Sequence, residues 1–477
     1  MVNTPTDGRG YGELLKQVTE QNGAIGELQH RIAEAQASLA VLMNAIAPYA
    51  PIYRLPTETL SAIFVMGHNE ECDPSKPSAG WRFTFRSSIC QVSRRFRDVA
   101  TQTAPLWCNL DIRLRRNMTG KLPHLYVQTC IERSKSCPLN ISIEILCCCS
   151  RCSPAQCYFS IVAEHIIPHL DRVRVLEFNI GNLNEIYIPF FQEMGAAKAP
   201  LLEEYRCIVG EHNIDDWLST SGSYHTFAGG SPRLTSITYE GRVYSSRLLP
   251  SLHTVTTLSL GGIGSYQGMS AILADFPLLD ALVVGPMSVD LEDPTGKPPI
   301  LVPSLRSFTT SGCESHWWCG VLQAPLLESL SIDSTITPYI HSALSIIRDT
   351  GKFPLLRSLS VETDSQPDDE EEALKTIDSQ FIKATPLLTH LTLDAPFPSI
   401  EAFLPILCPT QHCDEGDSVP WPHLQSVQLD PYFEFMLSEL AADRIQKGYP
   451  IGTLGMGDQV LTDGFDAEGR NVTDMIV

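Results

Sequence analysis

Cysteine is the residue type whose spacing in this sequence comes closest to a known chemical site. Cys149 and Cys152 form a Cys-x-x-Cys pair within a cysteine-rich run from 147 to 157, and such pairs occur in zinc sites. A structural zinc ion needs four ligands in a tetrahedral array, and no second pair of cysteines or histidines with suitable spacing follows. We therefore predict reduced thiols at the end of the strand-like segment 141–146, with no metal site and no cofactor.

Motifs of enzymatic catalysis are scarce. The sequence has no Gly-x-x-x-x-Gly-Lys-Ser/Thr phosphate loop, no His-Glu-x-x-His helix and no Gly-x-Ser-x-Gly nucleophile turn. The glycine-rich run 261–264 follows a strand-like segment, where a turn accounts for it. We therefore predict that the protein is not an enzyme; the alternative is an enzyme built on a repeat core.

Trp317 and Trp318 are adjacent in the sequence. Tryptophan is enriched among the residues that dominate binding energy at protein interfaces. The pair has two interpretations: an exposed anchor for a partner, or side chains that pack a loop.

Acidic residues recur directly after a repeated Leu-x-x-Leu-x-Leu pattern in the second half of the chain. The last four copies are followed by Asp333, Glu362, Asp394 and Asp430, and an earlier copy is followed by Glu240. Side chains alternate along a strand, so these carboxylates would lie opposite the buried leucines, stacked about 4.8 Å apart in a parallel ladder. Either they cap the following turns, or they form an acidic site for a Lys- or Arg-rich substrate segment.

The charge of the chain limits the classes of partner. The sequence has 55 acidic against 34 basic residues, a formal net charge of -21, which argues against nucleic acid and favours a basic protein partner. The segment from Met1 to Tyr11 lacks the order of a signal peptide, and no apolar run approaches the roughly 20 residues that span a bilayer. We expect a cytoplasmic or nuclear protein that does not bind membranes.

Residues 1–50 are predicted to form a helix. Apolar residues at alternating steps of three and four form one stripe: Val18, Ile25, Leu28, Ile32, Ala35, Leu39, Leu42 and Ile46. Gln21 interrupts this stripe, and Gly23 and Gly26 each weaken the helix by about 1 kcal/mol. These residues favour packing within the chain over the alternative, a dimeric coiled coil.

Residues 51–110 are predicted to form two helical segments separated by a loop. Pro56 suits the first turn of a helix, and Glu58 lies at the positive end of its dipole. The apolar face of this helix comprises Leu60, Ile63 and Phe64. Gly, Pro, Ser and acidic residues predict a loop over 65–88. Helical spacing resumes over 89–100, where the expected buried stripe comprises Ile89, Val92, Phe96 and Val99.

This region resembles the F-box family, in the form common in large fungal families. The family pattern opens with Leu-Pro-x-Glu-x-Leu and ends with Pro-Leu-Trp. The matching pieces occur in order: Leu55-Pro-Thr-Glu-Thr-Leu60, Ile63-Phe64, Cys90-x-Val-Ser-Arg-Arg-Phe96 and Pro105-Leu-Trp107. The resemblance covers residues 51–110, and the loop at 65–88 is longer than in a compact F-box.

The resemblance implies a substrate-recognition adaptor of a Skp–cullin–F-box ubiquitin ligase. The F-box would bind the Skp-family linker, which joins the chain to a cullin scaffold, and Trp107 would buttress the box. The residues expected to bind the linker are Leu55, Pro56, Glu58, Leu60, Ile63, Phe64, Val92 and Phe96. The alternative within this family is a scaffold that binds the linker but acts outside ubiquitination.

Residues 169–450 carry the Leu-x-x-Leu-x-Leu pattern, which resembles leucine-rich repeats. Clear copies are Leu279/Leu282/Val284, Leu327/Leu330/Ile332, Leu356/Leu359/Val361, Leu388/Leu391/Leu393 and Leu424/Val427/Leu429. Looser copies are Val173/Leu176/Phe178, Leu202/Tyr205/Cys207, Leu234/Ile237/Tyr239, Val255/Leu258/Leu260 and Leu305/Phe308. Stacked copies share one core, so these residues are expected to be buried.

The predicted fold is therefore α/β: an N-terminal helical F-box-like segment followed by an irregular leucine-rich-repeat solenoid of parallel strands with intervening helices. Residues 111–168 are expected to link the two parts and to start the solenoid. A helix is expected over 373–383 and another over 437–445. Residues 451–477 are expected to form a C-terminal tail.

Overall fold

The structure is a computed structural model in which two compact units are present. It describes residues 8–46, 49–71, 84–114, 122–145, 163–181, 188–209, 227–243, 253–263, 266–286, 296–312, 315–334, 337–362, 377–394, 421–429, 440, 444–456 and 459–461. Met1–Asn109 with Gln128–Cys137 form the first unit, here called the helical unit. Leu110–Val127 with Pro138–Val477 form the second, here called the sheet unit.

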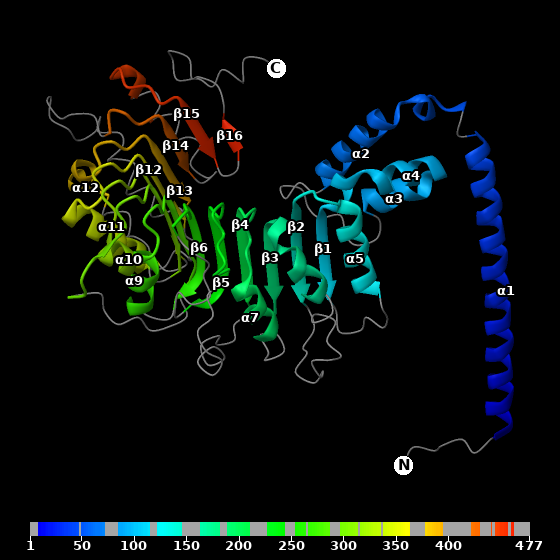
Figure 1. Cartoon of the computed structure of the whole chain (residues 1–477). Helices are drawn as coiled ribbons and strands as arrows, with labels where there is room; N and C mark the ends of the chain where they lie inside the picture. Colours follow the sequence, from blue (N-terminus) through cyan, green and yellow to red (C-terminus); the bar gives the residue numbers. More distant parts are fainter. Residues whose placement is uncertain are drawn as a thin grey trace. The chain divides into compact units, whose positions relative to one another are not determined.

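The helical unit begins with one long helix, α1 (Gly8–Ile46), which matches the helix expected over 1–50 (Figure 1). Short helices and 3-10 turns follow: η2 (Pro51–Arg54), α2 (Thr57–Glu71), α3 (Phe85–Val92), α4 (Arg94–Gln102), η3 (Ala104–Trp107) and α5 (Leu122–Ser134). A small apolar core joins α2, α3 and α4. Its buried side chains include Leu60, Phe64, Ile89, Phe96 and Val99.

The main sheet of the sheet unit is a ladder whose strands lie side by side in chain order, with two short strands of the unit left out of it (Figure 1). Its strands are β1 (Asn109–Leu114), β2 (Leu139–Ile145), β3 (Val173–Ile180), β4 (Glu204–Val209), β5 (Ser236–Val243), β6 (Thr257–Ile263), β7 (Ala281–Val284), β9 (Ser307–Ser311), β11 (Ser329–Asp333), β12 (Ser358–Glu362), β13 (His390–Asp394), β14 (Ser426–Leu429), β15 (Thr453–Met456) and β16 (Gln459–Leu461). Pairing is parallel from β2 to β15, and β15 pairs with β16 antiparallel. The expected α/β architecture with a parallel sheet is thus confirmed.

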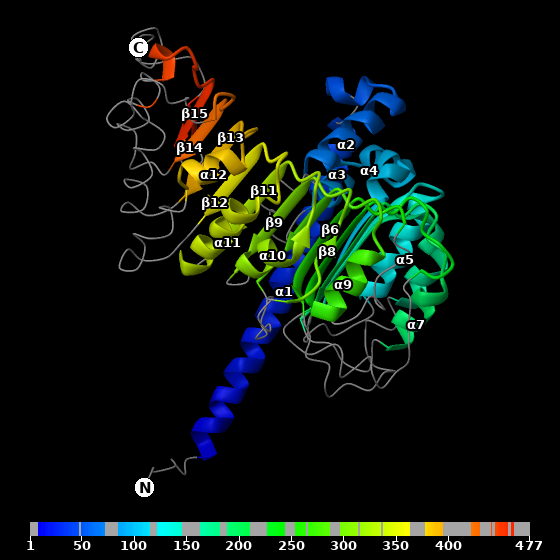
Figure 2. The ribbon, with the colours of Figure 1, turned by 90° about the vertical axis from the view of Figure 1, so that its left-hand side faces the viewer.

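Helices occupy several of the connections between these strands. They are η6 (Ile167–Arg172), α7 (Ile188–Ala196), α9 (Tyr266–Ala274), α10 (Ser315–Val321), α11 (Thr337–Thr350) and α12 (Ser379–Ala384). Figure 2 shows α9 to α12 along the same side of the sheet. β8 (Ile300–Leu301) and β10 (Leu322–Gln323) form a separate two-stranded parallel pair. One face of the main sheet is therefore packed, while the other carries the partly exposed residues of each strand.

Two columns of stacked side chains make the core of the sheet unit. The first column runs in register through Ile141, Leu176, Tyr205, Ile237, Leu258, Leu282, Phe308, Leu330, Leu359, Leu391, Val427 and Leu454. The second contains the apolar residue two positions later in each strand, except in β9. All residues named in the predicted repeat copies are buried, so their expected role in the core is confirmed.

Several boundaries differ from those expected. The loop expected over 65–88 is shorter, because α2 continues to Glu71 and α3 begins at Phe85; residues 72–83 lie outside the described part of the chain. The single helical segment expected over 89–100 is two helices that meet at Ser93, whose backbone is extended (φ -162°, ψ 170°). Ser93 accepts a hydrogen bond from the Phe96 amide over 3.2 Å, which makes it the N-cap of α4.

The ends of the sheet also differ from the expected domain limits. Residues 111–168 were expected to link the two parts and to start the solenoid; the ladder begins with β1, which starts at Asn109, and continues with β2 inside this segment. At the other end, β15 and β16 extend the sheet into the segment 451–477 expected to be a tail. The helix expected over 373–383 is α12, which starts at Ser379, and 373–376 lie outside the described residues. Most of the helix expected over 437–445 also lies outside them.

Thr310 occupies the place in the second column that is apolar in neighbouring strands, between Val284 and Ile332. Its side chain is fully buried, and its hydroxyl has no hydrogen-bond partner among the described residues. An unsatisfied buried hydroxyl lowers stability by about 1 to 3 kcal/mol. The missing apolar residue also explains why the repeat at Leu305 was recognised from two positions rather than three.

We predict that Thr310→Val raises the free energy of unfolding of the sheet unit by about 1 kcal/mol, because valine fills the same space without a buried polar group. The matched control is Thr309→Val on the opposite face of β9, where the side chain is partly exposed and no gain is expected. The measurement is denaturant unfolding of both variants beside the unsubstituted chain. Equal effects of the two substitutions would contradict the prediction.

Candidate functional site

Local signals in the sequence fix the ends of the helices in the helical unit. The Leu60 amide donates to the carbonyl of Pro56 over 3.1 Å, so proline stands in the first turn of α2 as expected. Thr84 caps α3 by accepting from the Ser87 amide over 3.3 Å. With Ser93 at the start of α4, polar caps determine where both α3 and α4 begin.

The motif pieces that carry the F-box resemblance converge in this unit. The Arg95 guanidinium donates to the carbonyl of Leu55, so the third piece of the motif is bonded to the first. The rings of Tyr53 and Phe64 both pack against the Phe96 ring, each with its centroid 5.1 Å away. Edge and offset contacts of this kind add stability beyond burial alone. The four pieces thus form one packed structure.

Trp107, in the last motif piece, is buried and held from three sides. Its indole Nε1 donates to the carbonyl of Ala100 over 2.9 Å. The guanidinium groups of Arg86 and Arg133 lie over the indole at 4.8 and 4.4 Å from the ring. Cation–π contacts are strongest where the cation is desolvated, and Arg86 is itself buried. Trp107 therefore contributes to the core of the helical unit and is not available on its surface.

The residues expected to bind the linker divide into two groups. Leu60, Phe64 and Phe96 are 0%, 2% and 6% exposed, so they hold the unit together and do not present a surface to a partner. Pro56, Glu58, Ile63 and Val92 are exposed, and Leu55 is half-buried. Leu60, Ile63 and Phe64 were expected on one apolar face, but only Leu60 and Phe64 are buried. The placement of Val92 in the buried stripe was wrong.

The exposed apolar residues of α2 lie on a stripe beside the buried one. Pro56, Ile63 and Met66 follow one another at helical spacing, and Ile63 and Met66 are 41% and 72% exposed. Sequence reasoning missed Met66, although its position three residues after Ile63 is the signal that identifies it. We define the docking stripe as Pro56, Ile63 and Met66.

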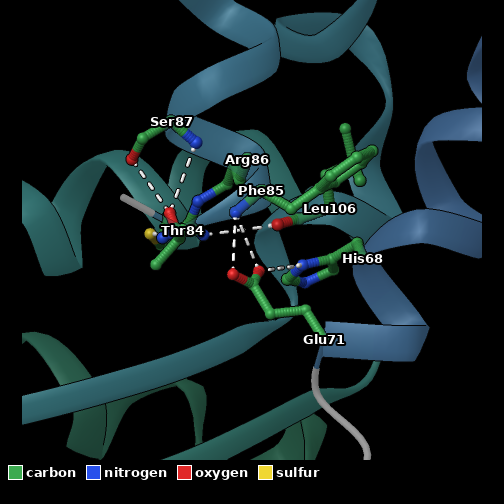
Figure 3. Close-up of polar contacts among 8 residues, drawn as sticks. His68, Glu71, Thr84, Phe85, Arg86, Ser87 and Leu106 are labelled. Atoms are coloured by element: carbon green, nitrogen blue, oxygen red, sulfur yellow. Dashed lines mark hydrogen bonds and ion pairs between the residues drawn. The ribbon is translucent and has the colours of Figure 1, made fainter. Parts of the chain in front are cut away.

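The end of α2 and the start of α3 are joined by polar contacts (Figure 3). The Glu71 carboxylate at the end of α2 accepts from the backbone amide of Phe85 at both oxygens, over 2.8 and 2.9 Å. Gly67 leaves room for the Phe85 ring, because a Cβ there would lie 2.5 Å from it. Arg86 donates to the carbonyl of Leu106 over 3.3 Å. The end of α2 and the start of α3 are therefore in direct contact.

His68 lies at the centre of this junction and is 5% exposed. Burial lowers the pKa of its imidazole, the positive charge of Arg86 lowers it further, and the Glu71 carboxylate, 3.9 Å from Nδ1, opposes the shift. The imidazole is therefore held neutral at a pH at which an exposed histidine would begin to take up a proton.

The open face of the sheet brings together three of the acidic residues expected to bind substrate. Asp333, Glu362 and Asp394 are exposed and lie in register on β11, β12 and β13. We call these three carboxylates the acidic ridge. Asp430 lies outside the described residues, and Glu240 lies within β5, opposite Ile208 rather than beside the ridge.

Small hydroxyl side chains cover the open face next to the acidic ridge. They stand at open-face positions of β9, β11, β12, β13 and β14, where His390 is also exposed. We call the hydroxyl side chains the hydroxyl floor: Ser307, Thr309, Ser329, Ser331, Ser358, Ser360, Thr392 and Ser426. Sequence reasoning missed this feature, although Ser and Thr at the variable positions of the repeat are its signal. The Ser360 hydroxyl donates to Glu362 over 3.2 Å, so floor and ridge are in contact.

Charges are distributed differently along the open face. Near its N-terminal end, Arg113 pairs with Asp111 and Glu144 over 3.0 and 3.5 Å. Arg206 similarly pairs with Glu204 and Glu177, over 3.1 and 3.8 Å. From β9 to β14, by contrast, the open-face positions of the strands contain no Lys or Arg. The acidic ridge is therefore the part of this face best suited to a basic ligand.

Other candidate sites do not come together in the described residues. The cysteine run 147–157 lies outside them, and within them no group of metal-binding side chains is present. Burial raises the pKa of the Cys207 and Cys319 thiols to about 12, which makes them unreactive. Trp317 and Trp318 are buried in α10, so the interpretation as an exposed anchor was wrong.

The glycine run 261–264 was expected to form a turn, but Gly261 and Gly262 lie within β6. Of the helices described, none combines the length and the apolar character needed to cross a lipid bilayer.

Comparison with models of known protein families found no match, and comparison with curated proteins found none either.

We predict that the stability of the helical unit falls as pH drops below about 6.5, the ordinary pKa of histidine, because the unfolded chain then binds a proton that folded His68 resists. His68→Gln should flatten this dependence. The measurement is the difference in unfolding temperature between about pH 5.5 and about pH 7.5. His30→Gln, on the exposed surface of α1, is the control and should keep the dependence of the unsubstituted chain. If His68→Gln keeps it too, His68 is not its source.

Proposed function

We propose that this protein is a substrate adaptor of a Skp–cullin–F-box ubiquitin ligase. The observation that carries the proposal is the convergence of the four motif pieces on one small core. Pieces separated by up to 40 residues meet through the Arg95 to Leu55 hydrogen bond and the ring contacts of Phe96. A chance series of short matches would not be expected to fold into a single packed unit.

The docking stripe supplies the surface that the proposal needs. Pro56, just before α2, and Ile63 and Met66 within it expose apolar area on a stripe beside the buried one, while the buried Leu60 and Phe64 hold the helix in place. Burial of exposed apolar side chains by a partner stabilises a complex by roughly 25 cal/mol per Å² before the costs of association. Glu58 and Val92 add a carboxylate and a further apolar contact at the same unit.

The open face of the sheet is the proposed site for substrate. The hydroxyl floor offers donors and acceptors on short side chains, so the backbone of an extended peptide can approach the strands closely. The acidic ridge adds charge that selects Lys and Arg in that peptide. The proposed substrate is therefore a protein with a basic segment, and the net charge of -21 favours its approach.

Catalysis by this chain is not required for the proposed function. An adaptor that holds a substrate near a ubiquitin-conjugating enzyme raises the effective concentration of the substrate lysine at the reactive thioester. The scarcity of catalytic motifs in the sequence is consistent with such a role. We further propose that the protein works in the cytoplasm or the nucleus, where this ligase system acts.

We predict that Ile63→Asp with Met66→Asp weakens binding of the Skp-family linker by on the order of tenfold or more, because it places two charges on the docking stripe. Both side chains are exposed, so the helical unit should stay folded. The measurement is the affinity of purified chain and linker, with co-purification of cullin from cells. Leu278→Asp, at a position 55% exposed in the sheet unit, is the matched control and should bind normally.

Two outcomes of this experiment bear on the proposal. Unchanged linker binding by the double variant would reject the docking stripe. Binding of the linker without cullin by the unsubstituted chain would favour an F-box scaffold that acts outside ubiquitination.

We predict that Glu362→Gln with Asp394→Asn weakens binding of a Lys- and Arg-rich peptide by about tenfold at low salt and less at high salt, because exposed charge pairs are screened. Fluorescence anisotropy with a labelled peptide measures the affinity. The control, Glu193→Gln with Asp275→Asn, removes the same charge from exposed positions outside the open face. If the ridge variant melts markedly earlier yet binds normally once folded, the carboxylates cap turns and do not bind substrate.

A further inference from the structure

Helix α1 exposes a long apolar stripe. Its members are between 50% and 61% exposed: Leu14, Val18, Ile25, Leu28, Ile32, Leu39 and Leu42. The expectation that this stripe packs within its own chain is not met among the described residues. A helix of 39 residues with Gly12, Gly23 and Gly26 gains little from propensity, so it needs packing to be stable.

The stripe follows a heptad repeat, abcdefg, in which positions a and d face a partner helix. The a positions are Val18, Ile25, Ile32 and Leu39, and the d positions are Leu14, Gln21, Leu28, Ala35 and Leu42. The pattern runs for four heptads, which meets the length that a coiled coil requires. β-branched residues at a with leucine at d favour two parallel strands over three or four.

Charges on α1 lie away from this seam. Lys16 approaches Glu20 to 4.0 Å and His30 approaches Glu34 to 3.7 Å, and all four belong to the outer positions c and f. The glutamates Glu13, Glu20, Glu27 and Glu34 recur every seventh residue at position c. They would therefore not face one another across the seam.

Charged residues at the flanking positions e and g determine whether two copies of the same helix repel each other in a coiled coil. Between 15 and 45, Arg31 is the one charged residue at these positions. In a parallel pair, position g lies near position e of the following heptad, so Arg31 would face Gln36 of the partner helix. At positions e and g of two paired copies, no like charges therefore oppose each other. These positions also carry no pattern of charges that would favour a different partner chain.

We propose that α1 pairs with α1 of a second copy of this chain as a parallel, two-stranded coiled coil. The apolar stripe of each helix becomes the seam, and Gln21 meets its own copy at one d position, where a polar pair fixes the register at some cost in stability. The dimer presents two open faces together, so a substrate with two basic segments is held by avidity.

The test uses the full chain in analytical ultracentrifugation over a series of concentrations. The expected species has twice the 52.7 kDa mass of the chain. Ile25→Asp with Ile32→Asp places charges in the seam and should leave only monomer. Ala33→Asp with Ala37→Asp adds the same charges on the outer face of the same helix and should leave the dimer intact. Far-ultraviolet circular dichroism and unfolding curves check that the rest of each variant stays folded.

The orientation is tested by oxidation of introduced cysteines. Leu28→Cys places equal positions opposite each other in a parallel pair, so it should form a disulfide-linked dimer, whereas Ala33→Cys on the outer face should not. The unsubstituted chain measures the background from its own cysteines.

Four results would overturn the proposal: a monomeric unsubstituted chain, a trimer, a dimer that survives the seam substitutions, or no crosslink through position 28. Linker binding is measured on the docking stripe of α2 and does not depend on the outcome.

Discussion

The stacking of two apolar columns is the interaction on which the rest of the sheet unit depends. A single strand such as β11 contributes only Leu330 and Ile332 to the core, and it cannot bury them without the equivalent residues of β9 and β12. Parallel sheets are usually covered on both faces, but here the alternate residues of each strand remain partly exposed. One face of the sheet therefore forms the core that stabilises it, and the residues of the other face remain partly exposed.

This division explains which parts of the fold could be predicted from the sequence. The buried positions follow from a local period of apolar residues, so the strands around Leu330, Leu359 and Leu391 were identified correctly. β1 and β2 lack the full repeat pattern; β2 joins the sheet by pairing with β3 and β1 by pairing with β2, and these pairings are not encoded locally. The apolar spacing over 89–100 likewise predicted a single helix, although Ser93 is an N-cap residue type within it. Two helices exist there.

The residues expected to bind the linker show a second limit of prediction from apolar periodicity. A small helical unit has few apolar residues, and the same motif must both fill its core and bind a partner. Leu60 and Phe64 are four residues apart and point inward, while Ile63 lies about 60° away around the helix and remains exposed. The sequence pattern contains Leu60, Ile63 and Phe64, but it does not show which of them fill the core and which remain on the surface. Only the packing of Phe96 against α2 decides which side of the helix is buried.

The distribution of charge on the open face depends on which side chains neighbouring strands place in register. Near the N-terminal end, Arg206 lies beside Glu177 in the ladder, so the carboxylate is neutralised within the sheet itself. In the acidic ridge, Asp333 and Asp394 lie on either side of Glu362, and three carboxylates about 4.8 Å apart repel one another. The open-face positions of the strands from β9 to β14 carry no Lys or Arg, so this half of the face differs in charge from the half around Arg206. The register of the strands, and not the repeat pattern alone, thus determines where like charges gather on the open face.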